Sequence, residues 1–154
     1  EFGRYAGYVM QHDILFPTLT CEEAISFAAR LKCDLKGEKL KEKVEKMMGI
    51  LGLTKCRNTY AGWMEDQGLS GGEKKRTSIA IELVSDPSII FLDEPTSGLD
   101  SHIALNIVKI IKHQAKLGRT VIATIHQPST QVFNMFDRFL LLMEGHCIYQ
   151  GLAC

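Results

Sequence analysis

Hydrophobic and polar positions divide the chain into a helical first half and a second half in which strands and helices alternate. Apolar residues recur every three or four positions over 21–32 and 38–51, the period of a helix with one buried face. The first of these helices is preceded by a capping-box pattern, Thr20 with Glu23. A short apolar run at 7–10 predicts a strand ahead of both helices.

The second half contains two continuous apolar runs, 88–92 and 120–125, that are typical of strands buried on both faces of a sheet. Periodicity and turn residues predict the other elements, which are helices over 71–85, 101–117 and 128–136 and a hairpin of 138–143 and 147–149. Strands that alternate with helices are joined by right-handed crossovers, so we expect an α/β fold with a mainly parallel sheet flanked by helices. The connection over 54–68 is irregular, and we expect its Trp63 to pack against a helix.

Composition and charge agree with a globular domain and exclude several classes of protein. The 154 residues fit one domain or a large part of one, and 45% hydrophobic with 23% charged residues is close to the globular average. The net charge is zero, so no overall field attracts nucleic acid or anionic lipid. The apolar runs are far shorter than the roughly 18 residues of a membrane helix, so we expect no membrane-spanning segment in this chain. The five cysteines are scattered, which favours a reducing compartment over a zinc site. The chain starts with neither an initiator Met nor a signal sequence, so we expect it to belong to a longer one.

The most distinctive local feature is a pair of acids, Asp93 and Glu94, directly after the apolar run at 88–92. Successive side chains of a strand point to opposite faces, so the two carboxylates cannot act at the same place. Asp93 suits a Mg²⁺ ion shared with substrate phosphates, and Glu94 then remains as a base or orienting group for an attacking water. Pro95 favours an extended backbone at Glu94. The alternative is that the acids only mark the exit of the strand.

A second feature is a small polar residue with two glycines before a helix, Ser70, Gly71 and Gly72. Their backbone amides, a hydroxyl and the helix N-terminus can form an anion site, and a glycine lets a phosphate approach without a Cβ in the way. The alternative is a plain capping box between Ser70 and Glu73, which needs no ligand. Nowhere does the sequence contain the phosphate-binding loop Gly-x-x-x-x-Gly-Lys-[Ser/Thr].

Two further polar residues follow predicted strands. His126 comes just after the run at 120–125, on the sheet edge that carries the acids if the two strands are neighbours, and an imidazole there can bond a phosphate oxygen. Gln11 ends the run at 7–10, and its amide can reach a metal or a water. A single histidine or glutamine in such a position is more often structural.

Taken in order, these segments resemble the ATP-binding cassette of ABC transporters. They match its Q-loop at Gln11, its signature at 69–73, its Walker B strand ending at Asp93 and Glu94, its D-loop at 97–100 and its H-loop at His126. Four segments resemble the G-type, or White-like, half-transporters in amino-acid sequence. These segments are 7–11, 70–78, 93–101 and 124–129. The resemblance covers nearly the whole chain and implies a P-loop NTPase fold of the ABC ATPase type with a helical subdomain. The Walker A loop and the adenine-stacking aromatic belong upstream of Gln11, so the resemblance also implies that the N-terminal part of the domain is missing.

The resemblance implies that ATP and Mg²⁺ are bound and that ATP is hydrolysed. Asp93 and Gln11 would hold Mg²⁺ through water, and Glu94 would polarise the attacking water. His126 would stabilise charge on the γ-phosphoryl group.

The resemblance also assigns the signature and the D-loop to a contact between two cassettes. Ser70, Gly71, Gly72 and Glu73 would bind the ATP that is held mainly by the opposite cassette, and Asp100 would organise the dimer seam. Glu73 replaces the glutamine of the common signature, as in many White-like members.

By resemblance, residues 20–68 form the helical subdomain and its connection, of which the helices over about 21–52 dock on the transmembrane part, and 69–154 carry the remaining motifs and the C-terminal hairpin. The implied partners are a second nucleotide-binding domain, in a homodimer or heterodimer, and the protein's own transmembrane domain, with no nucleic acid. This places the domain on the cytoplasmic face of a membrane, where it powers export of a lipid-like or other small substrate. Alternatives are a soluble cassette ATPase acting on ribosomes or DNA, and a non-hydrolytic interaction module. We expect the isolated piece to be inactive.

Overall fold

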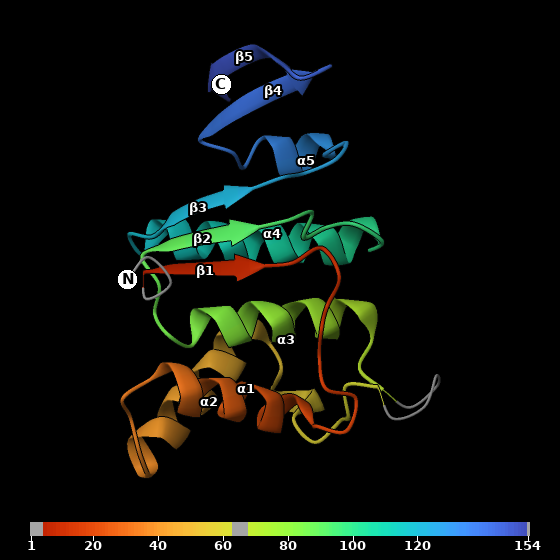
Figure 1. Cartoon of the computed structure of the whole chain (residues 1–154). Coiled ribbons are helices and arrows are strands. Elements are labelled where there is room, and N and C mark those ends of the chain that lie inside the picture. The colour runs from red at the N-terminus through yellow and green to blue at the C-terminus, as the bar shows by residue number, and fades with distance from the viewer. Residues whose placement is uncertain (1–4, 63–67, 154) are drawn as a thin grey trace.

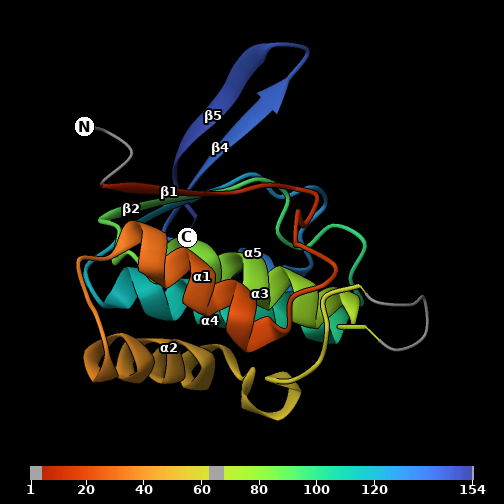
Figure 2. The same ribbon diagram turned by 60° about the horizontal axis from the view of Figure 1, so that its bottom comes forward.

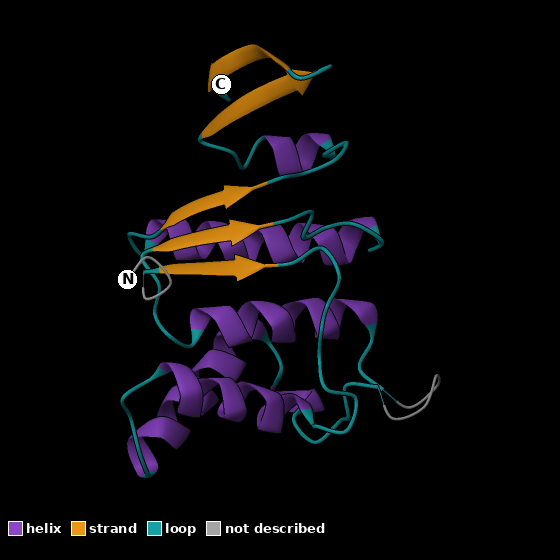
Figure 3. Cartoon of the chain, in the orientation of Figure 1, coloured by secondary structure: helices purple, strands orange, loops and turns teal. Residues whose placement is uncertain are grey.

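The computed structural model describes residues 5–62 and 68–153 of the chain (Figure 1). The expectation that Trp63 packs against a helix therefore lies outside the described residues. The described elements are a small parallel sheet, two long helices on one of its faces, a group of helices beyond these and a separate hairpin (Figures 1 and 3). This is the α/β fold expected from the alternation of strands and helices.

The parallel sheet has the order β1–β2–β3, with bounds Ala6–Val9, Ile89–Leu92 and Thr120–Ala123. The central strand β2 pairs in parallel with both neighbours, and the register sets Tyr8, Phe91 and Ile122 in one row across the sheet. Because all three strands run in the same direction, their carboxyl ends meet at one edge of the sheet.

Among the described helices, those that contact the sheet pack on one face of it. α3 (Gly71–Leu83) contacts β1 and α4 (Ser101–Lys116) contacts β3, and Figure 2 shows both helices on the same side of the strands. On the opposite face, Tyr8 is 54% and Ile122 51% exposed. The expectation of a strand over 120–125 that is buried on both faces is therefore wrong for β3, because nothing in the described part of the chain packs against its outer side.

The helical first half packs against α3, on the side away from the sheet. α1 (Cys21–Lys32) begins at the capping box of Thr20 and Glu23, in which both reciprocal hydrogen bonds are present. α2 (Glu38–Leu51) ends at Gly52, whose φ of +64° is the left-handed conformation that suits a glycine after a helix. One turn of 3₁₀ helix, η2 (Thr54–Cys56), follows. The bounds of α1 and α2 are those predicted from the apolar period.

The remaining elements lie at the C-terminal end. α5 covers only Thr130–Phe133 of the 128–136 expected, because Ser129 caps its start. β4 (Arg138–Met143) and β5 (His146–Leu152) form the antiparallel hairpin, which projects from the rest of the molecule in Figure 2. Its turn residues Glu144 and Gly145 both have positive φ, as in a type I′ turn. Throughout the described part of the chain, no helix is long and apolar enough to cross a membrane.

One apolar core joins the helical half to the sheet. Most of its buried side chains come from α1 to α4 and from β1 and β2, and they include Ile25, Met48, Ile79, Ile90 and Ile107. α3 contacts α1, α2, α4 and β1, so it is held from several sides. This packing places the start of α3 beside the start of α4.

Candidate functional site

Polar side chains gather at the carboxyl ends of all three parallel strands. Gln11 follows β1, Asp93 and Glu94 follow β2, and Thr124 and His126 follow β3. Ligands of parallel α/β sheets bind at this edge. The structure thus brings together the acids, the histidine and the glutamine that the sequence analysis singled out.

Both carboxylate oxygens of Asp93 accept hydrogen bonds from hydroxyl groups. Thr124 Oγ1 donates to Oδ1 over 2.7 Å, and the Tyr8 hydroxyl donates to Oδ2 over 3.3 Å. The negative charge of Asp93 raises the pKa of Tyr8, with burial and their hydrogen bond acting in the same direction, so the phenol stays protonated as a donor. Asp93 thus meets a hydroxyl donor at each of its two oxygens.

Glu94 does not have the extended backbone expected from the following Pro95, because its φ of +42° lies in the left-handed region. Its N–H donates to Thr124 Oγ1 over 2.9 Å, and its carbonyl accepts from the Ser97 N–H over 3.0 Å, which closes a turn. These hydrogen bonds outweigh the steric preference of a residue before proline. The Glu94 side chain accepts from Gln11 Nε2 over 2.8 Å, so the two carboxylate groups have different partners.

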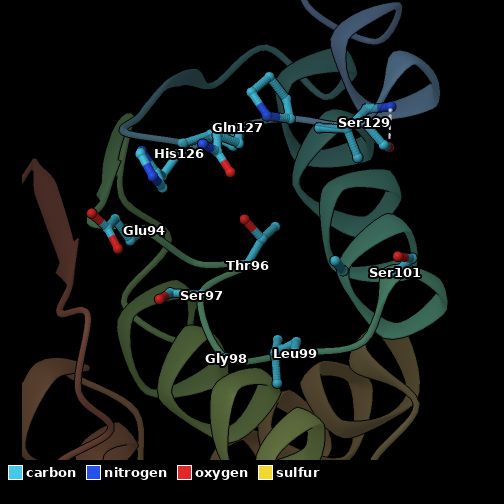
Figure 4. Close-up of a pocket in the computed structure, with 13 residues that line it drawn as sticks. Glu94, Thr96, Ser97, Gly98, Leu99, Ser101, His126, Gln127 and Ser129 are labelled. Atoms are coloured by element: carbon cyan, nitrogen blue, oxygen red, sulfur yellow. Dashed lines mark hydrogen bonds between the residues drawn. The ribbon is translucent and has the colours of Figure 1, made fainter.

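A pocket of about 330 Å³ lies between this sheet edge and the start of α4 (Figure 4). Glu94 and His126 line it, together with the turn over 96–99 and the segment 127–129. Gln127 in the pocket wall also has a left-handed backbone, with a φ of +47°. Glu94 and His126 therefore border the same space, and groups of these types can take up a proton or stabilise a negative charge.

Ser70 and Glu73 form the capping box that was one interpretation of their spacing. The Ser70 N–H and Oγ donate to Glu73 Oε2 over 2.9 and 2.7 Å, and the Glu73 N–H donates to Ser70 Oγ over 3.4 Å. Burial raises the pKa of Glu73, but the hydrogen bonds from Ser70 and Cys56 and the charge of Arg76 outweigh it and lower the pKa overall. The Ser70 hydroxyl must leave Glu73 before it can donate to an anion.

Gly72 is buried and faces α4. A Cβ placed on it would lie 2.7 Å from Ile103 Cγ2, closer than real Cβ contacts, whereas a Cβ on Gly71 would meet Leu99 Cδ2 at an ordinary 3.5 Å. The expectation that both glycines open a path for a phosphate stays a prediction, and the space that a Cβ on Gly72 would enter is filled by Ile103. Gly72 allows α3 to approach α4, and Gly71 is the exposed glycine at the start of the helix.

Asp100 is the N-cap of α4. Its Oδ1 accepts from the N–H groups of His102 and Ile103 over 2.9 and 3.0 Å. Ile103, which follows this cap, packs against Gly72 on α3. The cap therefore lies beside the start of α3. The sequence signal for this cap, an Asp immediately before a helix, was present but was not used in the predictions above.

Sequence reasoning missed Tyr8, Thr124 and Lys75. Lys75, only 2% exposed, donates through Nζ to the carbonyl oxygen of Gln11 over 2.8 Å and forms an ion pair with Asp13 over 2.9 Å. The signal for Lys75 was available, since it lies on the buried side of α3, where the helical period calls for an apolar residue. Tyr8 and Thr124 gave no signal, because their contacts depend on the pairing of strands.

The donor atoms at this edge suit a hard cation. In residues 5–62 and 68–153, no three His, Cys, Asp or Glu side chains form a cluster that could hold a metal by themselves. Mg²⁺ bound to a nucleotide, however, takes one or two carboxylates and keeps several waters. The oxygens of Asp93, Glu94 and Gln11 fit that requirement.

The chain is similar to a known protein family and to several curated proteins. A family model described as ABC transporter matches residues 1–97. The chain is 50% identical over 152 residues to ABC transporter G family member 26 of Arabidopsis thaliana, an alignment that covers 97% of the chain and 22% of that protein. It is 48% identical over 152 residues to member 14 of the same plant, with 97% of the chain and 24% of the relative covered. To ABC transporter G family member 1 of Dictyostelium discoideum it is 45% identical over 157 residues, with 99% and 20% covered. The chain thus spans between a fifth and a quarter of the length of these relatives.

Proposed function

The chain belongs to the ABC transporter family as part of a G-type nucleotide-binding domain, and on this premise we propose that the whole protein hydrolyses MgATP to drive transport. One observation carries the proposal. The acids that end β2 lie at the same sheet edge as Gln11 and His126, with the Gln11 amide 2.8 Å from the Glu94 carboxylate and His126 lining the same pocket.

Each residue at this edge has a distinct part in the proposed reaction. Glu94 accepts the proton of the attacking water or orients that water, and His126 bonds the γ-phosphoryl oxygens as negative charge develops. Asp93 and Gln11 would hold Mg²⁺ through water, and a cation held there would supply positive charge beside the phosphates. Support for this division comes from the different partners of the two acids, since Asp93 is held by hydroxyl groups and Glu94 by the Gln11 amide.

A second nucleotide-binding domain is the proposed partner at the start of α3. Ser70, Gly71, Gly72 and Glu73 would face ATP bound mainly by the opposite domain, and Asp100 would lie at the seam. In support, Gly71 is exposed at the helix N-terminus, and the Asp100 cap lies beside it. The buried Gly72 contributes by letting α3 and α4 approach each other. A homodimer and a heterodimer both fit this arrangement.

The protein's own transmembrane domain is the second proposed partner, and it places this domain at the cytoplasmic face of a membrane. α1 and the segment before it expose three large apolar side chains, with Phe16 65%, Phe27 50% and Leu31 71% exposed. The rings of Phe16 and Phe27 meet edge to face, 6.3 Å apart. An exposed apolar cluster of this kind is typical of a protein interface. Lys75 on α3 is hydrogen-bonded to Gln11, which lies on the segment that leads to Phe16. A displacement of the apolar surface can therefore be passed along this segment to Gln11 in the site.

The proposed cargo is a lipid-like or other small substrate that is exported. A soluble ATPase of the same family acting on ribosomes or DNA is the main competitor. The names of the relatives favour a transporter. Several spans of about 20 apolar residues in the rest of the protein are expected on our proposal.

Replacing Glu94 by Gln tests the proposal. Glutamine keeps the size of the side chain but cannot take up a proton, so we expect ATP turnover by the full-length protein to fall by a factor on the order of 10² or more. Nucleotide binding should remain nearly intact, because Glu94 acts on the water. Phosphate release and ATP titration measure the two effects.

Glu42→Gln is the matched control, since Glu42 is an exposed carboxylate on α2, far along the chain from the site. It should hydrolyse ATP at the wild-type rate. Turnover that is equally unchanged in Glu94→Gln would refute the assignment of Glu94.

A further inference from the structure

One hydroxyl group bridges the two acids at the end of β2. Thr124 lies just after β3, and its N–H donates to the Leu92 carbonyl over 3.0 Å, which extends the pairing of β3 with β2. Thr124 Oγ1 donates to Asp93 Oδ1 over 2.7 Å and accepts from the Glu94 N–H over 2.9 Å. The backbone of Thr124 is therefore anchored to β2, and its side chain contacts both acids.

The direction of these two hydrogen bonds follows from the groups involved. A backbone N–H can only donate, so the hydroxyl accepts from Glu94 and keeps its single proton for Asp93. Asp93 Oδ1 is then the acceptor of this hydrogen bond. The other oxygen of Asp93 accepts from Tyr8 on β1. Thr124 is thus the hydrogen-bond partner that Asp93 and Glu94 share.

The backbone of Glu94 needs this support. Its φ of +42° is unfavourable for a residue that carries a Cβ, and such conformations persist where several contacts hold them. The Thr124 hydroxyl fixes the N–H of Glu94, and the turn closed by Ser97 fixes its carbonyl. In this conformation the Glu94 side chain reaches Gln11.

We propose that Thr124 is a positioning residue that sets Asp93 and Glu94 relative to each other for ATP hydrolysis, an inference that rests on the function proposed above. Loss of its hydroxyl frees one oxygen of Asp93 and the N–H of Glu94 at the same time. The chemical step then slows, because the Glu94 side chain is no longer held in one orientation. Mg²⁺ also contributes less to nucleotide binding, because the Asp93 carboxylate can rotate.

The test compares Thr124→Val, Thr124→Ser and Thr120→Val in the full-length protein. Valine has the shape of threonine without the hydroxyl, whereas serine keeps it. Thr120, exposed at the other end of β3, is the matched control. We expect T124V to lower kcat by about tenfold to a hundredfold, because a misplaced group affects the chemical step, and to raise the KM for MgATP, because Mg²⁺ then contributes less to binding. T124S should recover most of the rate, and T120V should equal the wild type.

A second measurement separates positioning from loss of stability. ATP affinity is titrated with and without Mg²⁺ in the Glu94→Gln background, in which turnover is blocked. Adding T124V should reduce the gain in affinity that Mg²⁺ provides, while the Mg²⁺-free affinity and the Tm stay unchanged.

Two results would overturn the inference. One is a T124V protein with wild-type kcat and an undiminished Mg²⁺ effect, and the other is a T124S protein as slow as T124V. Failure of the proposed function is distinguishable from both, because it appears as a wild-type protein that does not hydrolyse ATP, and failure of the Glu94 assignment appears as full turnover in the single variant Glu94→Gln.

Discussion

The contact between Gly72 and Ile103 decides how closely α3 and α4 approach each other. A Cβ on Gly72 would lie 2.7 Å from Ile103 Cγ2, so one methyl group forces the two helices to move or Ile103 to leave its rotamer. Overpacking of this kind costs about 1–3 kcal/mol. Replacing glycine by alanine inside a helix gains at most about 1 kcal/mol, so the clash outweighs the gain in helix propensity.

We therefore expect Gly72→Ala to lower the free energy of unfolding by about 1–2 kcal/mol. Gly71→Ala is the matched control, since its Cβ would make an ordinary contact of 3.5 Å with Leu99, and it should change stability by less than about 0.5 kcal/mol. Denaturant unfolding of the full-length protein or its nucleotide-binding domain measures both. Equal stability of the two variants would show that α3 and α4 are not in close contact.

A buried lysine connects two elements of the fold, α3 and the segment that follows β1. Lys75 Nζ meets the carbonyl oxygens of Met10 and Gln11 over 3.2 and 2.8 Å and the Asp13 carboxylate over 2.9 Å. A buried ammonium is tolerated only when such partners replace water. The same contacts hold the backbone of Gln11 in place, so α3, which Ser70 caps, is connected to the residue whose amide reaches Glu94.

Replacing Lys75 by Met should destabilise the domain by about 3–5 kcal/mol, the usual cost of removing one partner of a buried ion pair. The cause is the Asp13 carboxylate, which stays largely buried without its counter-ion. Adding Asp13→Asn should recover part of the loss, because it removes the unpaired charge. Lys39→Met on the exposed side of α2 is the control and should stay within about 0.5 kcal/mol of the wild type. A double variant no more stable than Lys75→Met, measured by denaturant unfolding, would contradict this account.

In the whole molecule, the polar side chains that follow the three parallel strands share one sheet edge, while one face of the sheet is open within the described residues. Tyr8 and Ile122 are exposed on that face, in the same row as Phe91. The sequence also contains no Gly-x-x-x-x-Gly-Lys-[Ser/Thr] loop, the element that holds the β- and γ-phosphates in P-loop proteins. The carboxylates and the amide at this edge can bind a cation and a water (Asp93, Glu94 and Gln11). Few groups in the described part of the chain can bind the phosphates directly.

We therefore expect these 154 residues alone to bind ATP weakly or undetectably in calorimetry. The full-length protein, titrated in the same buffer with Mg²⁺, is the positive control. Micromolar affinity of the isolated 154-residue chain would mean that groups on the described surface hold the phosphates after all.

Local signals were sufficient for most elements of the fold. α1 and α2 have the predicted bounds, because a capping box and an apolar period act within one or two turns of a helix. The hairpin turn at Glu144 and Gly145 is local in the same way. β3 shows the limit of this reasoning. Its apolar run predicts a strand correctly, but it cannot tell whether anything covers the second face.

The sequence by itself determined which groups stand at the ends of the strands and at the start of α3, because strand and helix boundaries are encoded by neighbouring residues. Only the tertiary structure decided that Gly72 serves helix packing, that Glu94 adopts a left-handed backbone and that Thr124 joins Asp93 to Glu94. The physical reason is distance along the chain. Thr124 is 31 residues from Asp93 and 30 from Glu94, and such contacts depend on strand register and helix packing, which no local pattern specifies.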